Sequence, residues 1–113
     1  MNSIDFIATP VFAKNAKLLS KRYPSFANDL RELRQSLVEN PEQGVRLNNG
    51  FRKIRMAIAS KGKGKSGGAR VITLNYLHDE LDGKIVLVTV YDKSDRSSIT
   101  DKEIRQALNG VEE

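Results

Sequence analysis

Cysteine and tryptophan are absent from this chain of 113 residues, and histidine occurs once, at His78. Without cysteine the chain can form neither a disulfide framework nor a thiolate metal site, which is typical of proteins in a reducing cytosol. A single histidine provides too few ligands for a usual zinc site. It also excludes acid–base catalysis by a pair of histidines.

Long apolar runs are lacking as well. No segment is apolar over the length of a transmembrane helix, and the first residues, MNSIDFIATP, lack the basic start and apolar stretch of a signal peptide. We therefore expect a cytoplasmic protein that does not bind membranes. The length suits one domain, residues 1–113, because the sequence contains no internal repeat and no interdomain linker.

Positive charge, in contrast, is abundant. Lys and Arg number 19 against 14 Asp and Glu, which gives a net charge of +5. No acidic residue lies between Glu42 and Asp79, and this gap contains the segment FRKIRMAIASKGKGKSGGAR, residues 51–70. The excess predicts an anionic partner, although charge sign alone does not separate nucleic acid from a membrane surface or an acidic protein.

Apolar periodicity predicts an α+β domain with the element order β-α-α-β-β-β-α. Two N-terminal helices should pack as a hairpin on a mostly antiparallel four-stranded sheet. We expect Ser25 to cap the second helix, and Thr100 and Glu103 to form a capping box before the last helix. The predicted strands span residues 4–9, 51–59, 69–77 and 84–91, with a hairpin turn at 78–83, and the predicted helices span 10–23, 26–39 and 100–108.

The last predicted strand differs from the others in composition. Its sequence IVLVTVY is apolar at both parities, which is typical of a central strand that is covered on both faces. The two N-terminal helices can cover one face. We expect the C-terminal helix to cover the other.

The basic segment begins with a strand pattern. Ile54 and Met56 alternate with Lys53 and Arg55, so one face of this strand presents cations. A glycine-rich loop follows, which we expect to be flexible, and then a strand rich in β-branched residues. Such cations could simply solubilise an exposed sheet edge, but the adjacent KGKGK loop favours binding of a polyphosphate chain.

The loop ASKGKGKS, residues 59–66, also matches a relaxed nucleotide-binding phosphate loop. A phosphate loop must open a helix whose N-terminal amides hold the nucleotide. The sequence that follows, GGARVITLNYL, has the pattern of a strand. We therefore do not expect an NTPase.

Three segments, LNNGFRKIRMA, KGKGKSGGARVITLNY and VLVTVYDKSD, resemble the RelE/ParE superfamily of bacterial toxins, and most closely its HigB-like branch. The resemblance covers nearly the whole chain. It implies a small domain of the microbial-ribonuclease type that acts as the toxin of a type II toxin–antitoxin system. RelE and HigB-like members cut messenger RNA in the ribosomal A site without a metal or cofactor, and a cognate antitoxin, here expected to be a helix-turn-helix protein, neutralises them.

The same resemblance implies a catalytic surface formed by Lys53, Arg55, Arg70 and Lys93. Metal-free RNA cleavage needs a base for the 2′-hydroxyl, cations for the phosphorane and an acid for the 5′-oxygen. Without a pair of histidines, these roles fall to Lys and Arg. Lys53 is the expected base, Arg55 and Arg70 are expected to bind the scissile phosphate, and Lys93 to supply acid or charge.

Further RNA contacts are expected around this surface. RelE has a C-terminal tyrosine that stacks on a base, whereas this chain has Ile99 and Thr100 in that region, so stacking would come from Tyr76 or Tyr91 or be absent. Strand alternation puts Arg70 on the face of Ile72 and Leu74, which predicts a bulge or twist near residues 67–68 to turn it toward the other cations. The basic residues expected to bind RNA are Arg52, Lys61, Lys63 and Lys65.

Three other functions remain open. A gyrase inhibitor of the ParE type shares the fold but would not need this density of cations on the sheet. An RNA-binding module without catalysis would bind RNA with strong salt dependence and leave it uncut. A degenerate toxin would bind its antitoxin alone.

Overall fold

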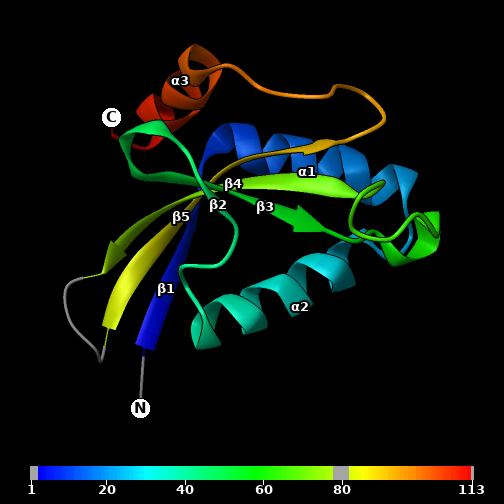
Figure 1. Cartoon of the computed structure of the whole chain (residues 1–113), viewed down its shortest axis with the longest axis horizontal. Coiled ribbons are helices and arrows are strands. Elements are labelled where there is room, and N and C mark those ends of the chain that lie inside the picture. Colours follow the sequence, from blue (N-terminus) through cyan, green and yellow to red (C-terminus); the bar gives the residue numbers. More distant parts are fainter. Residues whose placement is uncertain (1–2, 78–81, 113) are drawn as a thin grey trace.

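A mixed sheet of five strands lies at the centre of the computed structural model, which describes residues 3–77 and 82–112 (Figure 1). The predicted α+β class is confirmed. The strand order is β1-β5-β4-β3-β2. The strands are β1 (Ser3–Ala8), β2 (Val45–Arg46), β3 (Phe51–Met56), β4 (Ala69–Leu77) and β5 (Asp82–Asp92), and the helices are α1 (Pro10–Arg22), α2 (Phe26–Glu39) and α3 (Asp101–Glu112).

The expected four-stranded sheet is wrong in two respects. β2 adds a fifth strand, antiparallel to β3, and β1 pairs with β5 in parallel, which makes the sheet mixed. β2 has two residues, too few for the alternation that reveals a strand in a sequence. The direction of β1 depends on its pairing partner, which its own sequence does not specify.

The antiparallel pairing of β4 with β5 is confirmed. Most of the turn predicted at 78–83, including His78, lies outside the described residues. The prediction of a central strand covered on both faces is also confirmed, because β5 is buried at every position from Ile85 to Asp92. Its partner β4 is antiparallel also to β3, so three adjacent strands form a continuous floor.

Helices α1 and α2 cover one face of this sheet. Phe12 and Leu19 of α1 and Phe26 and Leu37 of α2 are buried in one cluster with Val71 of β4. Burial of each large apolar side chain stabilises the fold by about 2 kcal/mol. No helix in the described residues has the length and apolar character to cross a membrane.

Polar side chains fix the start of α1 against β5. The Thr9 hydroxyl oxygen accepts a hydrogen bond from the Phe12 amide at 2.9 Å and donates to the Val88 carbonyl at 2.7 Å. β1 ends opposite Leu87, so the rest of β5 has no strand on that side. The Asn15 amide covers this edge by donating to the Val90 carbonyl at 3.2 Å.

Helix α3 covers the second face, as predicted. Its capping box is present, because the Thr100 amide donates to Glu103 Oε1 and the Glu103 amide donates to Thr100 Oγ1, each at 3.2 Å. The contact between α3 and the sheet forms a second core, made by Phe51, Ile72, Val86, Val88, Ile104 and Ala107.

The connection between β3 and β4, residues 57–68, folds back on the end of β3. A Cβ atom on Gly68 would lie 2.2 Å from the Met56 carbonyl oxygen. A Cβ atom on Gly67 would lie 2.4 Å from Lys63 Cβ. These positions require glycine because the chain approaches its own backbone too closely for any side chain.

We expect Gly68→Ala to destabilise the protein by about 3 kcal/mol, because the methyl group must push the backbone of β3 aside. Gly62→Ala is the control. Gly62 has a φ of +73°, and a Cβ atom added to it would meet no atom within 4 Å, so its cost is the left-handed backbone alone, about 1 kcal/mol. Urea unfolding of both variants measures the difference. Equal losses would contradict the close approach at Gly68.

Candidate functional site

Three of the predicted catalytic residues share one face of the sheet. Arg55 lies directly opposite Arg70 in the pairing of β3 with β4, and Lys53 lies opposite Ile72. Residues that oppose each other across an antiparallel pair point to the same side. Since Ile72 packs under α3, the three cations lie on the α3 side of the sheet.

The bulge expected near Gly67 and Gly68 is wrong. The register between β3 and β4 is continuous over all of β3, and the irregularity falls instead between Ile72 and Thr73, in the pairing of β4 with β5. Arg70 needs no bulge to reach the other cations, because Lys53 and Arg55 lie on the same face of the sheet as Ile72. Helix α3 covers the apolar part of this face and leaves Arg55 exposed.

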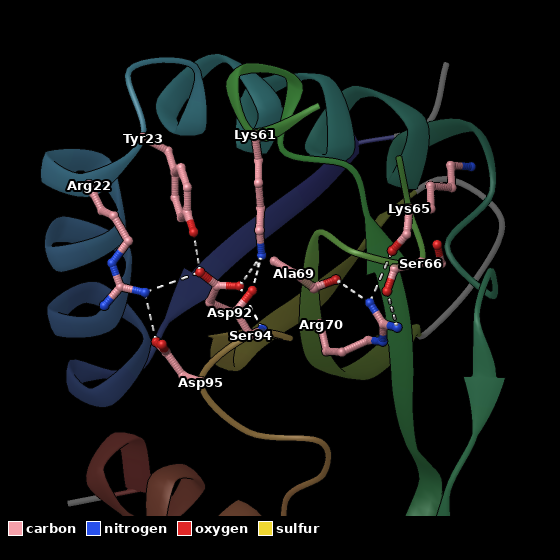
Figure 2. A network of polar contacts seen from close by, with 10 residues as sticks. All are labelled: Arg22, Tyr23, Lys61, Lys65, Ser66, Ala69, Arg70, Asp92, Ser94 and Asp95. Carbon is pink, nitrogen blue, oxygen red and sulfur yellow. Dashed lines mark hydrogen bonds and ion pairs between the residues drawn. The ribbon is translucent and has the colours of Figure 1, made fainter. Parts of the chain in front are cut away.

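Arg70 is buried, with 5% of its surface exposed. Its guanidinium donates to three main-chain carbonyls, Lys65 at 3.0 Å, Ser66 at 3.1 Å and Ala69 at 3.2 Å (Figure 2). Two of these carbonyls belong to the basic loop. Arg70 therefore fastens the second half of that loop to the start of β4.

A second group of polar contacts fastens the first half of the loop. Lys61 Nζ donates to Asp92 Oδ1 at 2.6 Å, and Asp92 Oδ2 accepts from Arg22 at 3.1 Å and from the Tyr23 hydroxyl at 2.5 Å (Figure 2). The Asp92 side chain is fully buried and that of Lys61 is 11% exposed. Lys61, which was predicted to bind RNA, thus has its charge bonded inside the protein.

These contacts lower the pKa of the Asp92 carboxyl. Burial by itself would raise the pKa of the carboxyl, but hydrogen bonds from Lys61 and Tyr23 and from the Ser94 amide outweigh it and hold the pKa well below its usual value of 3.8. The carboxylate is therefore charged in the folded protein under all mild conditions. Its partners come from α1, from the basic loop and from the segment after β5.

The beginning of α2 holds the same loop from another side. Asp29 Oδ2 accepts from the Ala59 amide at 3.1 Å, and Ser25 Oγ accepts from the Ser60 amide at 2.8 Å. Ser25 is the N-cap residue of α2, as predicted, but its hydroxyl makes no capping bond to a main-chain amide of the helix. The expected flexible loop is thus bonded to the rest of the protein along both halves.

Lys63 and Lys65 remain on the surface of this loop. Both side chains are exposed, in contrast to that of Lys61, which precedes Gly62. The loop therefore has one lysine that points inward to Asp92 and two lysines that face solvent. The exposed pair adds positive charge to a loop whose Lys65 carbonyl is bonded to Arg70.

Lys93 lies just beyond β5 at the edge of the cationic face. Its amide donates to the Gly68 carbonyl at 2.9 Å, which brings this segment beside the end of the loop. Its Nζ donates to the Ser97 carbonyl at 3.1 Å. Lys93 is partly exposed, and this bond to a neutral carbonyl leaves its ammonium able to reach a ligand.

Two predicted RNA-binding residues lie away from these cations. Arg52 has the opposite parity to Lys53, and its guanidinium donates to the carbonyls of Glu42 at 2.5 Å and Gln43 at 3.3 Å. Tyr76 is 43% exposed, but it is six residues from Arg70 along β4, which is about 20 Å. The structure does not bring either residue together with the cations.

Tyr91 lies next to Arg70 across β4 and β5 and is 7% exposed. Arg96 lies over its ring, with 5.7 Å between the guanidinium carbon and the ring centroid. Burial raises the pKa of the Tyr91 hydroxyl, and the charges of Arg70 and Arg96 oppose this rise. The ring is too deeply buried to offer a stacking surface in this conformation.

Sequence reasoning missed Asp92 and its partners Arg22 and Tyr23. Asp92 ends a strand that is apolar at both parities, and an acidic residue in such a strand requires a cationic partner when it is buried. That signal could have identified Asp92. Nothing in the sequence pairs it with Lys61, 31 residues away, or with Arg22, 70 residues away.

Within residues 3–77 and 82–112, no group of three or more His, Cys, Asp and Glu side chains could hold a metal ion. The candidate site is thus a set of cations and one buried tyrosine. No protein-family model matches the chain.

We expect Arg70→Met to release the second half of the loop, because three carbonyls lose their donor. The loss of stability should be about 2 kcal/mol. Trypsin should then cut faster after Lys63 and Lys65, which limited proteolysis with mass spectrometry detects. Arg55→Met is the matched control on the opposing strand, and it should change neither stability nor cleavage. Equal behaviour of the two variants would contradict the fastening role of Arg70.

We expect Asp92→Asn to cost about 3 kcal/mol at pH 7, because Lys61 loses its buried partner. The folded pKa of Asp92 is depressed, so its contribution is complete above pH about 4 and is lost as the pH falls further. Urea unfolding between pH 7 and 2 should therefore show a steeper acid loss in the wild type than in Asp92→Asn. Asp95→Asn, at a half-exposed carboxylate, should keep most of the wild-type slope.

Proposed function

We propose that this chain is the toxin of a type II toxin–antitoxin system, a HigB-like member of the RelE/ParE superfamily, and that it cuts messenger RNA on the ribosome. One observation carries the proposal. Arg55 and Arg70 oppose each other on the α3 face of the sheet, with Lys53 on the same face. The exposed Lys63 and Lys65 lie on the loop that Arg70 holds.

This arrangement suits a phosphodiester backbone. Lys53 and Arg55 are two positions apart on one strand, which is about 7 Å, and the sheet fixes their spacing. Arg offers a planar fork that matches phosphate oxygens, whereas Lys offers a compact charge that can lose a proton. A rigid floor with both residue types can therefore hold a phosphate and also assist proton transfer.

The proposed reaction uses the 2′-hydroxyl of the RNA. Lys53, in its neutral form, takes the 2′-hydroxyl proton while the 2′-oxygen attacks phosphorus. Arg55 stabilises the added negative charge of the phosphorane. The bond from phosphorus to the 5′-oxygen breaks, and Lys93 gives a proton to that oxygen. The products are a 2′,3′-cyclic phosphate and a 5′-hydroxyl.

Arg70 has a different part in this proposal from the one expected from the sequence. Its guanidinium is bonded to three carbonyls, so it is a positioning residue for the loop rather than a direct phosphate ligand. Its positive charge still contributes to the electrostatic potential of this face, because Arg70 is buried directly opposite Arg55. The loop lysines depend on it for their position.

The exposure of Arg55 on the sheet supports dependence on the ribosome. An open surface binds RNA but does not by itself orient the 2′-hydroxyl in line with the leaving oxygen. A ribosome that holds the codon would supply that orientation.

We expect Lys53→Ala/Arg55→Ala to abolish growth arrest and to reduce messenger RNA cleavage by at least about 100-fold, because both the base and a phosphate ligand are lost. Primer extension after induced expression measures the breaks, which should be in phase with codons. Arg31→Ala/Arg34→Ala is the control for charge. It removes two exposed cations from α2, across the sheet from the site, and should leave cleavage unchanged.

Each remaining function gives a different result in this experiment. A gyrase inhibitor would arrest growth without codon-phased breaks and would block DNA supercoiling by purified gyrase. A non-catalytic RNA-binding module would retain salt-dependent RNA affinity and leave the message intact. Either result, or full cleavage by the Lys53→Ala/Arg55→Ala variant, would overturn the proposal.

A further inference from the structure

Helices α1 and α3 border a groove of about 450 Å³ beside the end of β5. Leu19 and Ala107 are buried at this groove, and Val11, Leu18 and Ile99 add apolar surface to its walls. Lys53, Arg55 and Arg70 do not line it, whereas Tyr91, the neighbour of Arg70, does. The groove therefore adjoins the proposed catalytic face without containing its three cations.

Two apolar side chains at this groove are unusually exposed. Val11 is 40% exposed and Leu18 is 54% exposed. They are seven residues apart on α1, which is two helical turns, so they form one stripe that faces the groove. Exposed apolar side chains grouped along a groove are typical of a surface that binds another protein.

The charges inside the groove are already paired. Arg22 contacts Asp95 at 2.8 Å, and Arg96 contacts Glu103 at 2.8 Å through a two-pronged contact. The hydrogen bonds from Arg96 hold the pKa of Glu103 at about 2. A ligand in the groove therefore contacts apolar walls and ion pairs whose charges neutralise each other.

The outer side of α1 is cationic. Lys14 follows Val11 by three positions and Lys21 follows Leu18 by three positions, so each apolar residue has a lysine as its neighbour on the helix surface. Both lysines are exposed. No acidic residue occurs between Asp5 and Asp29 in the sequence, so nothing on α1 neutralises them.

We propose that this groove docks an acidic amphipathic helix of a partner protein. Its apolar side chains would pack between Val11 and Leu18 of α1 and the facing side of α3, and its carboxylates would pair with Lys14 and Lys21. This is the helix-in-groove mode of recognition, with anchors one to two turns apart. The inference does not rest on RNA cleavage. Its test uses other variants and measures the binding of peptides, not of RNA.

Other occupants fit the surface less well. Single-stranded RNA binds to exposed aromatic rings and cations, and the one aromatic side chain that lines this groove, Tyr91, is buried. A second copy of the chain would bring two cationic α1 surfaces together, which repel each other. An acidic helix matches both the apolar stripe and the charge beside it.

A phage-displayed library of helical peptides, each 16 residues long, tests the proposal. Every peptide has Leu along one face of the helix and Glu, Lys or Ala at the other positions. Selection on the intact protein should enrich Glu. Synthetic copies of the selected peptides should bind at least tenfold more weakly to Leu18→Glu than to the wild type. Ser20→Glu, with the same charge change on the opposite side of α1, should bind them within twofold of the wild type. Thermal melting confirms that each variant is folded.

Reversing the charges of Lys14 and Lys21 tests their proposed pairing with the carboxylates of the peptide. Selection on Lys14→Glu/Lys21→Glu should enrich Lys in place of Glu at the positions beside the Leu face. The proposal is overturned if no binders emerge, if Lys is enriched on the wild type, or if Leu18→Glu leaves affinity unchanged. It is also overturned if Leu18→Glu instead abolishes self-association in sedimentation or affinity for a single-stranded RNA oligonucleotide.

Discussion

A loop of like charges has to be held in place by groups outside itself. Residues 59–70 contain Lys61, Lys63, Lys65 and Arg70 and no carboxylate, so repulsion favours an open conformation. The fold resolves this by turning two cations inward. Lys61 reaches the buried Asp92, and Arg70 reaches the carbonyls of the loop itself. The other two lysines can then face solvent without unfolding the loop.

This division connects stability with the proposed chemistry. The inward cations fix the loop at the end of β5 and the start of β4, and the two outward lysines face solvent. Helix α3 covers the apolar part of the same face, so one side of the sheet contains both a core and an open charged surface. The groove between α1 and α3 is not lined by Lys53, Arg55 or Arg70.

Much of the fold follows from local patterns. The capping box of Thr100 and Glu103 and the alternation in β3 specify elements through neighbours close in sequence, and these predictions are confirmed. β2 was missed because two residues carry no periodic signal. The fifth strand and the parallel pairing of β1 arise from contacts between distant segments, for which single-strand patterns contain no information.

The sequence by itself determined which residues are cations and on which side of each strand they lie. The alternation of side chains along each predicted strand assigned Lys53 and Arg55 to one face, and Arg70 to the face of Ile72. Only the tertiary structure decided that these are the same face and that Arg70 and Lys61 are bonded internally. The physical reason is that register and ion pairing join strands and loops far apart in the chain, and a charge pattern does not reveal which cations will find buried partners.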